Sequence, residues 1–292
     1  MLRKLVCSVL FAWVIAIPYA RGQTPLVFVS ITPQKYFAQH IGGEHIAVHV
    51  MVGAGQNPVT YEPSMKQMAA LRSAVLYHRA GIAFENAWMS RIVAANPAIR
   101  IVDARDAIEL LPMASIAEVF GQGSAQHGSG GVMDPHFWTD PMRVKAVCRQ
   151  LMVQLISLDP AHRGDYEKNF HRFASQLDIL HAEIKVLLAD KQGASFMVFH
   201  PAWGYFAHAY GLRQVPIEIR GRDPGAKTLA AVIDYARKQH IQAVIVQKQF
   251  STRAAAVVAK AIHAEVISVD PMQEDYLQSM RTVANVIAGA AR

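Results

Sequence analysis

Cysteine is almost absent from this chain of 292 residues, which has only Cys7 and Cys148. Cys7 lies in an N-terminal segment that we expect to be removed, so the mature chain would keep one thiol. One thiol cannot form an intramolecular disulfide, which excludes a disulfide-stabilised fold. Stability must therefore come from buried apolar side chains, and a mature length of about 270 residues suits two domains.

Long hydrophobic runs are also missing. The chain begins with basic residues at Arg3 and Lys4, followed by an apolar run over residues 5–17 and small residues up to Gly22. This run is shorter than the roughly 20 apolar residues that span a bilayer, and a charge, Gly or Pro interrupts every later run. Such an order is typical of a secretory signal peptide. We expect residues 1–22 to be a cleaved signal peptide and the mature protein to be exported.

Clusters of Lys and Arg with interleaved aromatic residues are a third absence. Removal of residues 1–22 leaves 26 basic and 22 acidic residues, a net charge of +4. A mildly basic chain without such clusters gives little support to a nucleic-acid partner. We therefore predict that the protein does not bind nucleic acid.

The sequence does contain a regular alternation of short β-branched, apolar runs with amphipathic or polar stretches. This alternation predicts an α/β fold in which βα units build parallel sheets. The runs form two groups of four, which predicts two lobes. The predicted strands are residues 26–30, 46–52, 74–80 and 99–105 in the first lobe, and 196–200, 214–219, 242–247 and 265–270 in the second.

One long helix is predicted between the lobes. Asp159 is a candidate N-cap, and Pro160 suits the first helical position. Apolar residues then recur at spacings of four and three, which is typical of a helix with one buried face. They are Tyr166, Phe170, Phe173, Leu177, Leu180, Ile184 and Leu187. A helix of roughly 28 residues, on the order of 40 Å, would be a rigid connection.

The motif MDPHFWTDP at residues 133–141 places His136 between two Asp-Pro pairs. Each proline biases the preceding aspartate toward an extended or cap conformation, so His136 lies on a short, stiff segment. A Gly/Ser-rich stretch over residues 121–131, which contains His127, comes directly before it. A single rigid histidine is compatible with ordinary packing as well as with a functional site, so the rest of the chain must decide.

Three polar residues end predicted strands of the second lobe: His200, Gln247 and Asp270. Ligands of open α/β sheets bind at the carboxyl ends of the strands. These side chains would therefore meet at one edge of the sheet and face His136 across a cleft between the lobes. Two imidazoles and one carboxylate suit zinc and related first-row ions, whereas magnesium or calcium would need mostly oxygen ligands.

Four segments carry a family resemblance: GQNPVTYEPS (55–64), DPHFWTDP (134–141), FHPAWGYFAHAYGL (199–212) and VIVQKQFSTRAAAVVAKAIHAEVISVDP (244–271). In order and spacing they resemble the metal-binding receptors of zinc and manganese ABC importers, the periplasmic zinc-uptake type among them. The resemblance covers nearly the whole mature chain. It implies a monomeric two-lobe clamp with limited hinge motion, which captures a divalent ion and delivers it to an ABC permease in the inner membrane.

The resemblance also implies a division of the chain. After the signal peptide (1–22) come an N-terminal metal-binding lobe (23–158), the connecting helix (159–192) and a C-terminal metal-binding lobe (193–292). Each lobe would supply ligands to one site in the cleft.

Four ligand positions are implied by the resemblance, and they fall on Val59, His136, His200 and Asp270. Zinc-type relatives usually have histidine at the first position, and valine cannot bind a metal. The fourth donor would then be water, Glu62 or His127, and a histidine at position 59 would complete the shell. Histidine at position 200 favours Zn²⁺ over Mn²⁺, because imidazole suits borderline ions while manganese tolerates more oxygen.

A secreted zinc-dependent hydrolase is the main alternative, because two histidines and one acid with an open position also describe a catalytic zinc. The sequence has neither an HExxH pair nor a Gly-x-Ser-x-Gly motif, and no general base can be assigned. We therefore predict that the protein is not an enzyme. A metal-binding surface adhesin with the same fold is a second alternative, which a transport complementation assay would distinguish.

Overall fold

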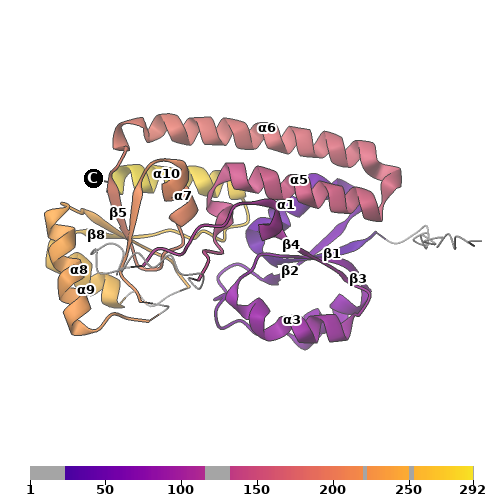
Figure 1. Cartoon of the computed structure of the whole chain (residues 1–292), viewed down its shortest axis with the longest axis horizontal. Coiled ribbons are helices and arrows are strands. Elements are labelled where there is room, and N and C mark those ends of the chain that lie inside the picture. Colours follow the sequence, from indigo (N-terminus) through magenta and orange to yellow (C-terminus); the bar gives the residue numbers. More distant parts are fainter. Residues whose placement is uncertain (1–23, 116–131, 220–221, 250–252, 292) are drawn as a thin grey trace, which may run out of the picture.

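Two parallel sheets, each of four strands, form the framework of the protein (Figure 1). The computed structural model describes residues 24–115, 132–219, 222–249 and 253–291. The strands are β1 Leu26–Ile31, β2 Ala47–Val52, β3 Ala74–Arg79, β4 Arg100–Asp103, β5 Ser195–Val198, β6 Arg213–Pro216, β7 Ala243–Val246 and β8 Glu265–Ser268. The eight predicted strands and their parallel pairing are confirmed, although most strands end one to three residues earlier than predicted.

The two sheets share one topology. The strand order is β2-β1-β3-β4 in the first sheet and β6-β5-β7-β8 in the second. In each sheet the chain leaves a central strand first toward one side and then toward the other, which creates a switch point beside that strand. In the second sheet this point lies between β5 and β7, and the predicted site residues His200 and Gln247 follow these two strands.

Helices connect the strands and cover the sheets, which explains why the strands are mostly apolar runs. They are α1 Thr32–Gly42, α2 Met65–Ala70, α3 Ala83–Ala95, α5 Pro141–Leu158, α6 Arg163–Leu187, α7 Gly204–Ala209, α8 Ala226–Lys238, α9 Arg253–Ile262 and α10 Tyr276–Ala290. Among the residues that the structure describes, no helix is both long and apolar enough to cross a membrane. The predicted signal peptide, residues 1–22, lies outside the described residues.

The predicted connecting helix is α6, which runs along both halves of the molecule at the top of Figure 1. Its apolar stripe is buried as predicted except at Leu187, which is exposed while the following Leu188 is buried. Asp159 and Pro160 lie at the predicted N-cap and first positions, but of a short 3-10 turn, and the Asp159 carboxylate accepts hydrogen bonds from His162 Nδ1 and Tyr166 Oη without capping a backbone N–H of that turn. This turn covers residues 160–162, and α6 itself has 25 residues.

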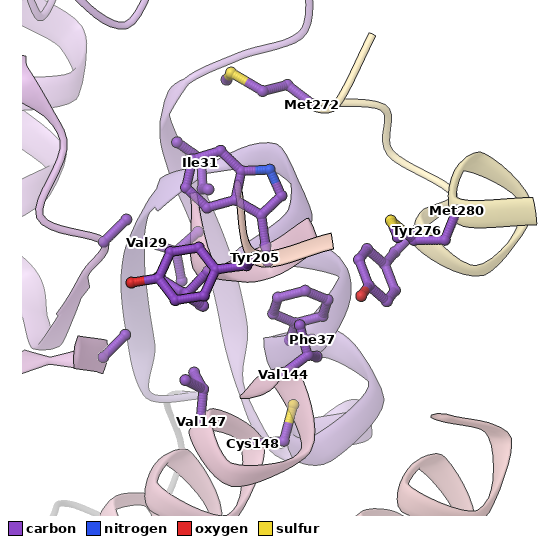
Figure 2. Close-up of a cluster of buried hydrophobic side chains, with 14 of the residues drawn as sticks. Val29, Ile31, Phe37, Val144, Val147, Cys148, Tyr205, Met272, Tyr276 and Met280 are labelled. Carbon is purple, nitrogen blue, oxygen red and sulfur yellow. The ribbon is translucent and has the colours of Figure 1, made fainter. Parts of the chain in front are cut away.

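One apolar core extends across both halves (Figure 2). Val29 of β1, Phe37 of α1 and Cys148 of α5 belong to the same cluster as Tyr205 of α7 and Tyr276 of α10. The rings of Phe37 and Tyr276 meet edge to face, with centroids 4.9 Å apart. The two sheets are thus joined by close packing as well as by α6, and close packing resists large relative movements.

A second, smaller cluster packs α8 and α9 against the opposite face of the second sheet. Alternation along β5 explains the division, because successive side chains point to opposite faces of a sheet. Phe196 and Val198 join the shared core, whereas Met197 joins the smaller cluster. The second sheet is therefore covered on both faces, and its strand ends remain as the place where polar side chains can gather.

Candidate metal centre

Two aspartates, one on each side of His136, hold the segment of residues 134–140 in place. Asp134 is buried, and its Oδ1 accepts hydrogen bonds from both the backbone N–H of His136 (2.9 Å) and His136 Nδ1 (2.7 Å). Asp140 caps α5 by accepting from the backbone N–H of Met142 (2.8 Å) and pairs with Arg143. The segment therefore fixes both the position and the orientation of the His136 imidazole.

His200 is oriented in the same way by a different carboxylate. It lies two residues after β5, and its Nδ1 is 2.8 Å from Oε1 of Glu218, which lies two residues after β6. Both side chains are buried, at 9% and 5% exposure. A buried carboxylate beside a ring nitrogen places the proton on that nitrogen, so the other nitrogen becomes an acceptor.

The two imidazoles meet through these acceptor nitrogens. Nε2 of His136 lies 3.3 Å from Nε2 of His200, and the ring planes are 77° apart. Two unprotonated nitrogens cannot form a hydrogen bond with each other, so a cation between them is the favourable occupant. Two nitrogens that bind one tetrahedral zinc at its usual bond length would be separated by about 3.3 Å.

Burial also controls the charge of His200. It lowers the pKa of His200 below the ordinary value of 6.5, and the neighbouring His136 lowers it further, while the hydrogen bond to Glu218 acts in the opposite direction. The imidazole therefore stays neutral below the pH at which an exposed histidine would protonate. Neutral imidazole is the form that binds a metal.

His136 and His200 both line a small, partly enclosed cavity of about 30 Å³. One buried water molecule needs about 10–15 Å³ of such space, so the cavity has room for about two. The residues that line the cavity are Pro58, Ile82, His136, Trp138, His200, Ala202, Gln247, Gln249, Pro271 and Met272. The cavity can hold a single ion together with an attached water molecule.

Contacts across the cavity join the two halves. Trp138 Nε1 donates to the carbonyl of Pro271 (3.1 Å), and Asn57 Nδ2 donates to the carbonyl of Gln249 (3.2 Å). Lys35 of α1 forms an ion pair with Glu274 near the start of α10. The structure is thus closed around the cavity.

Asp270, the third predicted ligand, lies beside the cavity but does not line it. Its Oδ1 accepts hydrogen bonds from Gln249 Nε2 (2.8 Å) and the backbone N–H of Met272 (2.9 Å). Across residues 24–115, 132–219, 222–249 and 253–291, no three His, Cys, Asp or Glu side chains are grouped closely enough to hold a metal ion. The structure therefore brings His136 and His200 together. Asp270 does not line the cavity and contacts it through Gln249, which does.

The proposed sources of a fourth donor are not in the cavity. Glu62 is exposed and absent from the lining, and Val59 is 53% exposed on the same loop. His127 lies outside the described residues. Pro58 is the residue of this loop that reaches the cavity, and it offers only an apolar surface.

Sequence reasoning did not assign the carboxylates that hold the site. Asp134 could have been noticed, because it lies two residues before His136 in the same motif. Glu218 and Gln249 gave no such signal, since they meet His200 and Asp270 only in the folded protein.

Glu85 supports the wall of the cavity on the side of the first sheet. It is fully buried; Oε1 accepts from Ser30 Oγ, and the two carboxylate oxygens accept from Arg79 and from the backbone N–H groups of residues 80–81. These bonds fix the loop after β3, which carries Ile82 into the cavity lining. Glu85 thus has a structural role and is not placed to bind an ion.

Comparison with known proteins gives relatives over nearly the whole chain. The high-affinity zinc uptake system protein ZnuA of Bacillus subtilis is 25% identical over 251 residues, which are 84% of this chain and 78% of the relative. The zinc-binding lipoprotein AdcA of Streptococcus pneumoniae strain TIGR4 is 25% identical over 258 residues, which are 85% of this chain but 50% of the relative.

Solved structures give a similar result. A crystal structure of ZnuA superimposes with a TM-score of 0.85 at 36% identity, covering 92% of this chain and 100% of that chain. A zinc-bound deletion mutant of ZnuA gives a TM-score of 0.83 at 36% identity, with 92% and 98% covered. Residues 27–290 also match the family model for ZnuA, so this chain belongs to the family described as zinc-uptake complex component A, periplasmic.

Proposed function

We propose that this protein is an extracytoplasmic solute-binding receptor that captures Zn²⁺ between two lobes and delivers it to an ABC permease. One observation carries this proposal. Two imidazoles, each held at Nδ1 by a buried carboxylate, present their Nε2 atoms to each other at 3.3 Å. Histidines that bind zinc are typically oriented by such carboxylates, and the zinc-binding relatives support zinc as the ion. Manganese is the weaker candidate, because it prefers oxygen ligands.

The size of the cavity supports transport of a single ion and disfavours the hydrolase alternative. A cavity of about 30 Å³ cannot admit a peptide or an ester beside the metal. We therefore propose that the protein has no enzymatic activity and that its ligand is the ion itself. Release would need the two halves to separate by a small movement.

We propose lobes at residues 23–158 and 193–292, connected by residues 159–192. The separate sheets support this division, and the long α6 supports a stiff connection. The shared core around Phe37 and Tyr276 supports a limited hinge motion instead of a wide opening. We further propose that the receptor is a periplasmic monomer, with Asp270 belonging to the metal site.

A zinc titration of the chelator-stripped mature protein tests the site. His136→Ala and His200→Ala should each abolish tight binding, because one remaining imidazole cannot hold zinc against water and chelator. His171→Ala, which changes an exposed histidine on α6, is the matched control and should bind like the parent. If the double variant His136→Ala/His200→Ala binds zinc with the affinity of the parent, the assignment of the site is wrong. Competition with Mn²⁺ in the same assay measures the selectivity of the site.

The carboxylate behind His200 gives an independent test. Glu218→Gln keeps the shape of the side chain but removes the charge that holds the proton on His200 Nδ1. We expect zinc affinity to fall about ten-fold, the lower end of the usual effect of such partners. Glu265→Gln changes an exposed carboxylate on the same sheet and should have no effect. Equal affinities for the two variants would mean that Glu218 does not support the metal site.

A further inference from the structure

Two glutamines line the cavity together with the histidines. Gln247 follows β7 directly, and Gln249 lies two residues further along the same turn. The residue between them, Lys248, is exposed. β7 is the neighbour of β5, the strand that precedes His200, so both glutamines reach the cavity from the switch point of the second sheet.

The amide groups of these glutamines have a defined orientation. Nε2 of Gln249 donates to Asp270 Oδ1 (2.8 Å), and Nε2 of Gln247 donates to the backbone carbonyl of His200 (3.3 Å). Because both partners accept only, the nitrogen of each amide must face them, and the oxygen points the other way.

Both amide oxygens are buried, and no donor among the described residues reaches either one. Gln247 as a whole is 1% exposed. A buried amide oxygen without a hydrogen bond is destabilising, so each of these two atoms needs an explanation. A cation in the cavity would supply the missing partner for both.

We propose that Oε1 of Gln247 and Oε1 of Gln249 complete the metal shell begun by His136 and His200. This inference rests on the proposed function and deepens it. The two glutamines supply oxygen donors that the loop of the first lobe does not provide. Val59 of that loop is exposed, and Pro58 lines the cavity with an apolar surface. The shell then contains two imidazole nitrogens and two neutral amide oxygens.

A repeated pattern supports this assignment. Nδ1 of His136 lies 2.7 Å from Asp134 Oδ1, and Nδ1 of His200 lies 2.8 Å from Glu218 Oε1. In the same way, Gln249 Nε2 donates a hydrogen bond to Asp270 Oδ1 at 2.8 Å. Asp270 thus acts as a positioning residue that fixes the amide of Gln249, as the other carboxylates fix their imidazoles.

The backbone of Gln249 is also held from the first half of the molecule. Asn57 Nδ2 donates to its carbonyl, while Asn57 Oδ1 accepts from the backbone N–H of Val59 (2.8 Å). This loop lines the cavity only through Pro58, yet it still contributes to the site, because it holds the segment that carries Gln249.

Metal titrations of the mature protein with Zn²⁺ and Mn²⁺ test the proposal. Gln247→Leu and Gln249→Leu should each weaken zinc binding about ten-fold, and they should weaken manganese binding more, because manganese depends more on oxygen donors. Lys248→Leu, between the two in sequence and exposed, is the matched control and should bind like the parent. Equal losses for both ions would indicate general disruption of the cavity and would overturn the proposal.

A double-variant comparison separates the two possible roles of Asp270. If Asp270 acts through Gln249, Asp270→Asn in the Gln249→Leu background should cost less than two-fold further zinc affinity. A further loss of ten-fold or more would show that Asp270 binds the metal directly and that Gln249 is not a ligand. The proposed function would still be supported in that case if the parent binds zinc and the His136→Ala variant does not.

A crystal structure of the zinc-loaded parent gives a test that does not depend on variants. We expect at least one glutamine Oε1 within about 2.0–2.2 Å of the zinc, the usual distance for an oxygen ligand. Zinc ligated by His136, His200 and only Asp270 or water would overturn the inference and leave the proposed function intact. Failure of the parent to bind zinc would overturn both.

Discussion

At the scale of single residues, Val59 has the clearest consequence for metal binding. Its side chain is 53% exposed and does not line the cavity, although the neighbouring Pro58 does. The backbone N–H of Val59 is bound to Asn57 Oδ1, which fixes the direction of its side chain. A ligand at this position would therefore need the loop to rearrange.

We accordingly expect Val59→His to leave zinc affinity within about three-fold of the parent. The sequence alone suggested that a histidine here would complete the shell, and the exposed position of Val59 argues against that expectation. Isothermal titration of parent and variant is the measurement, with Thr60→His as the control for an added histidine on the same loop. A ten-fold gain specific to Val59→His would show that the loop turns inward when metal binds.

Single residues also show how far the sequence could predict the site. His136 and His200 can be selected as candidates because their signals are local: a histidine between two Asp-Pro pairs and a histidine after an apolar strand. Asp270 is a candidate for the same reason, but its bond to Gln249 could not be read from the chain, since the two residues are 21 positions apart. Local patterns thus locate polar residues at the sheet edge, while tertiary contacts decide which atoms face the ion.

At the scale of elements, α8 and α9 end in the same uncommon way. His240 and His263 follow them with φ of 53° and 57°, the left-handed region that favours glycine. The residues after them, Ile241 and Ala264, donate to carbonyls in the last turns of α8 and α9, so the conformation closes each helix. Each histidine is exposed and offers no packing to offset the strain.

Glycine at these two positions should therefore stabilise the second lobe. We expect His240→Gly and His263→Gly each to raise the free energy of unfolding by roughly 0.5–1 kcal/mol. Urea unfolding followed by circular dichroism measures the change. Gln239→Gly, next to His240 but with φ of −89°, is the control and should destabilise the protein. A loss of stability in both histidine variants would contradict the argument.

Elements were predicted well because their signals repeat along the chain. Eight apolar runs gave eight strands, and the spacing of four and three gave α6. The ends were predicted less well. Aspartate is a residue type that favours the N-cap position, but the Asp159 carboxylate binds the side chains of His162 and Tyr166 instead of a backbone N–H. Glu218, assigned to a strand, lies beyond the end of β6, where it can turn toward His200.

At the scale of the whole molecule, the shared core was not predicted. The sequence indicates two groups of βα units, but it gives no sign that α10, the last helix, packs on α1 and α6. The contact of Phe37 with Tyr276 joins residues more than 200 positions apart, and Arg281 of α10 lies 98 positions from its partner Glu183 of α6, so no local pattern records them. Because the core continues from one half to the other, we expect the metal-free protein to unfold as one cooperative unit instead of lobe by lobe.

The stability of that unit should depend on pH through His78, which is 1% exposed in β3. Nδ1 lies 3.3 Å from Gln34 Nε2 of α1, and Nε2 lies 3.1 Å from Gln150 Oε1 of α5. Burial lowers the pKa of His78 from 6.5 to about 4, while the hydrogen bond to Gln150 and the charge of Asp103 oppose the shift. The folded protein therefore keeps this imidazole neutral over a range in which the unfolded chain binds a proton.

Between pH 6.5 and pH 4, the unfolded state binds one more proton than the folded state, so falling pH favours unfolding. We expect the contribution of His78 to reduce the free energy of unfolding by about 3 kcal/mol across this range. The measurement is urea unfolding of metal-free protein at several pH values, comparing the parent with His78→Gln and with the exposed control His171→Gln. His78→Gln is expected to be less stable at pH 7, and its disadvantage should shrink steadily as the pH falls to 4, whereas the control should run parallel to the parent. A constant difference between the parent and His78→Gln would mean that His78 protonates equally in both states, and that its neutral, buried form does not determine the acid stability of the protein.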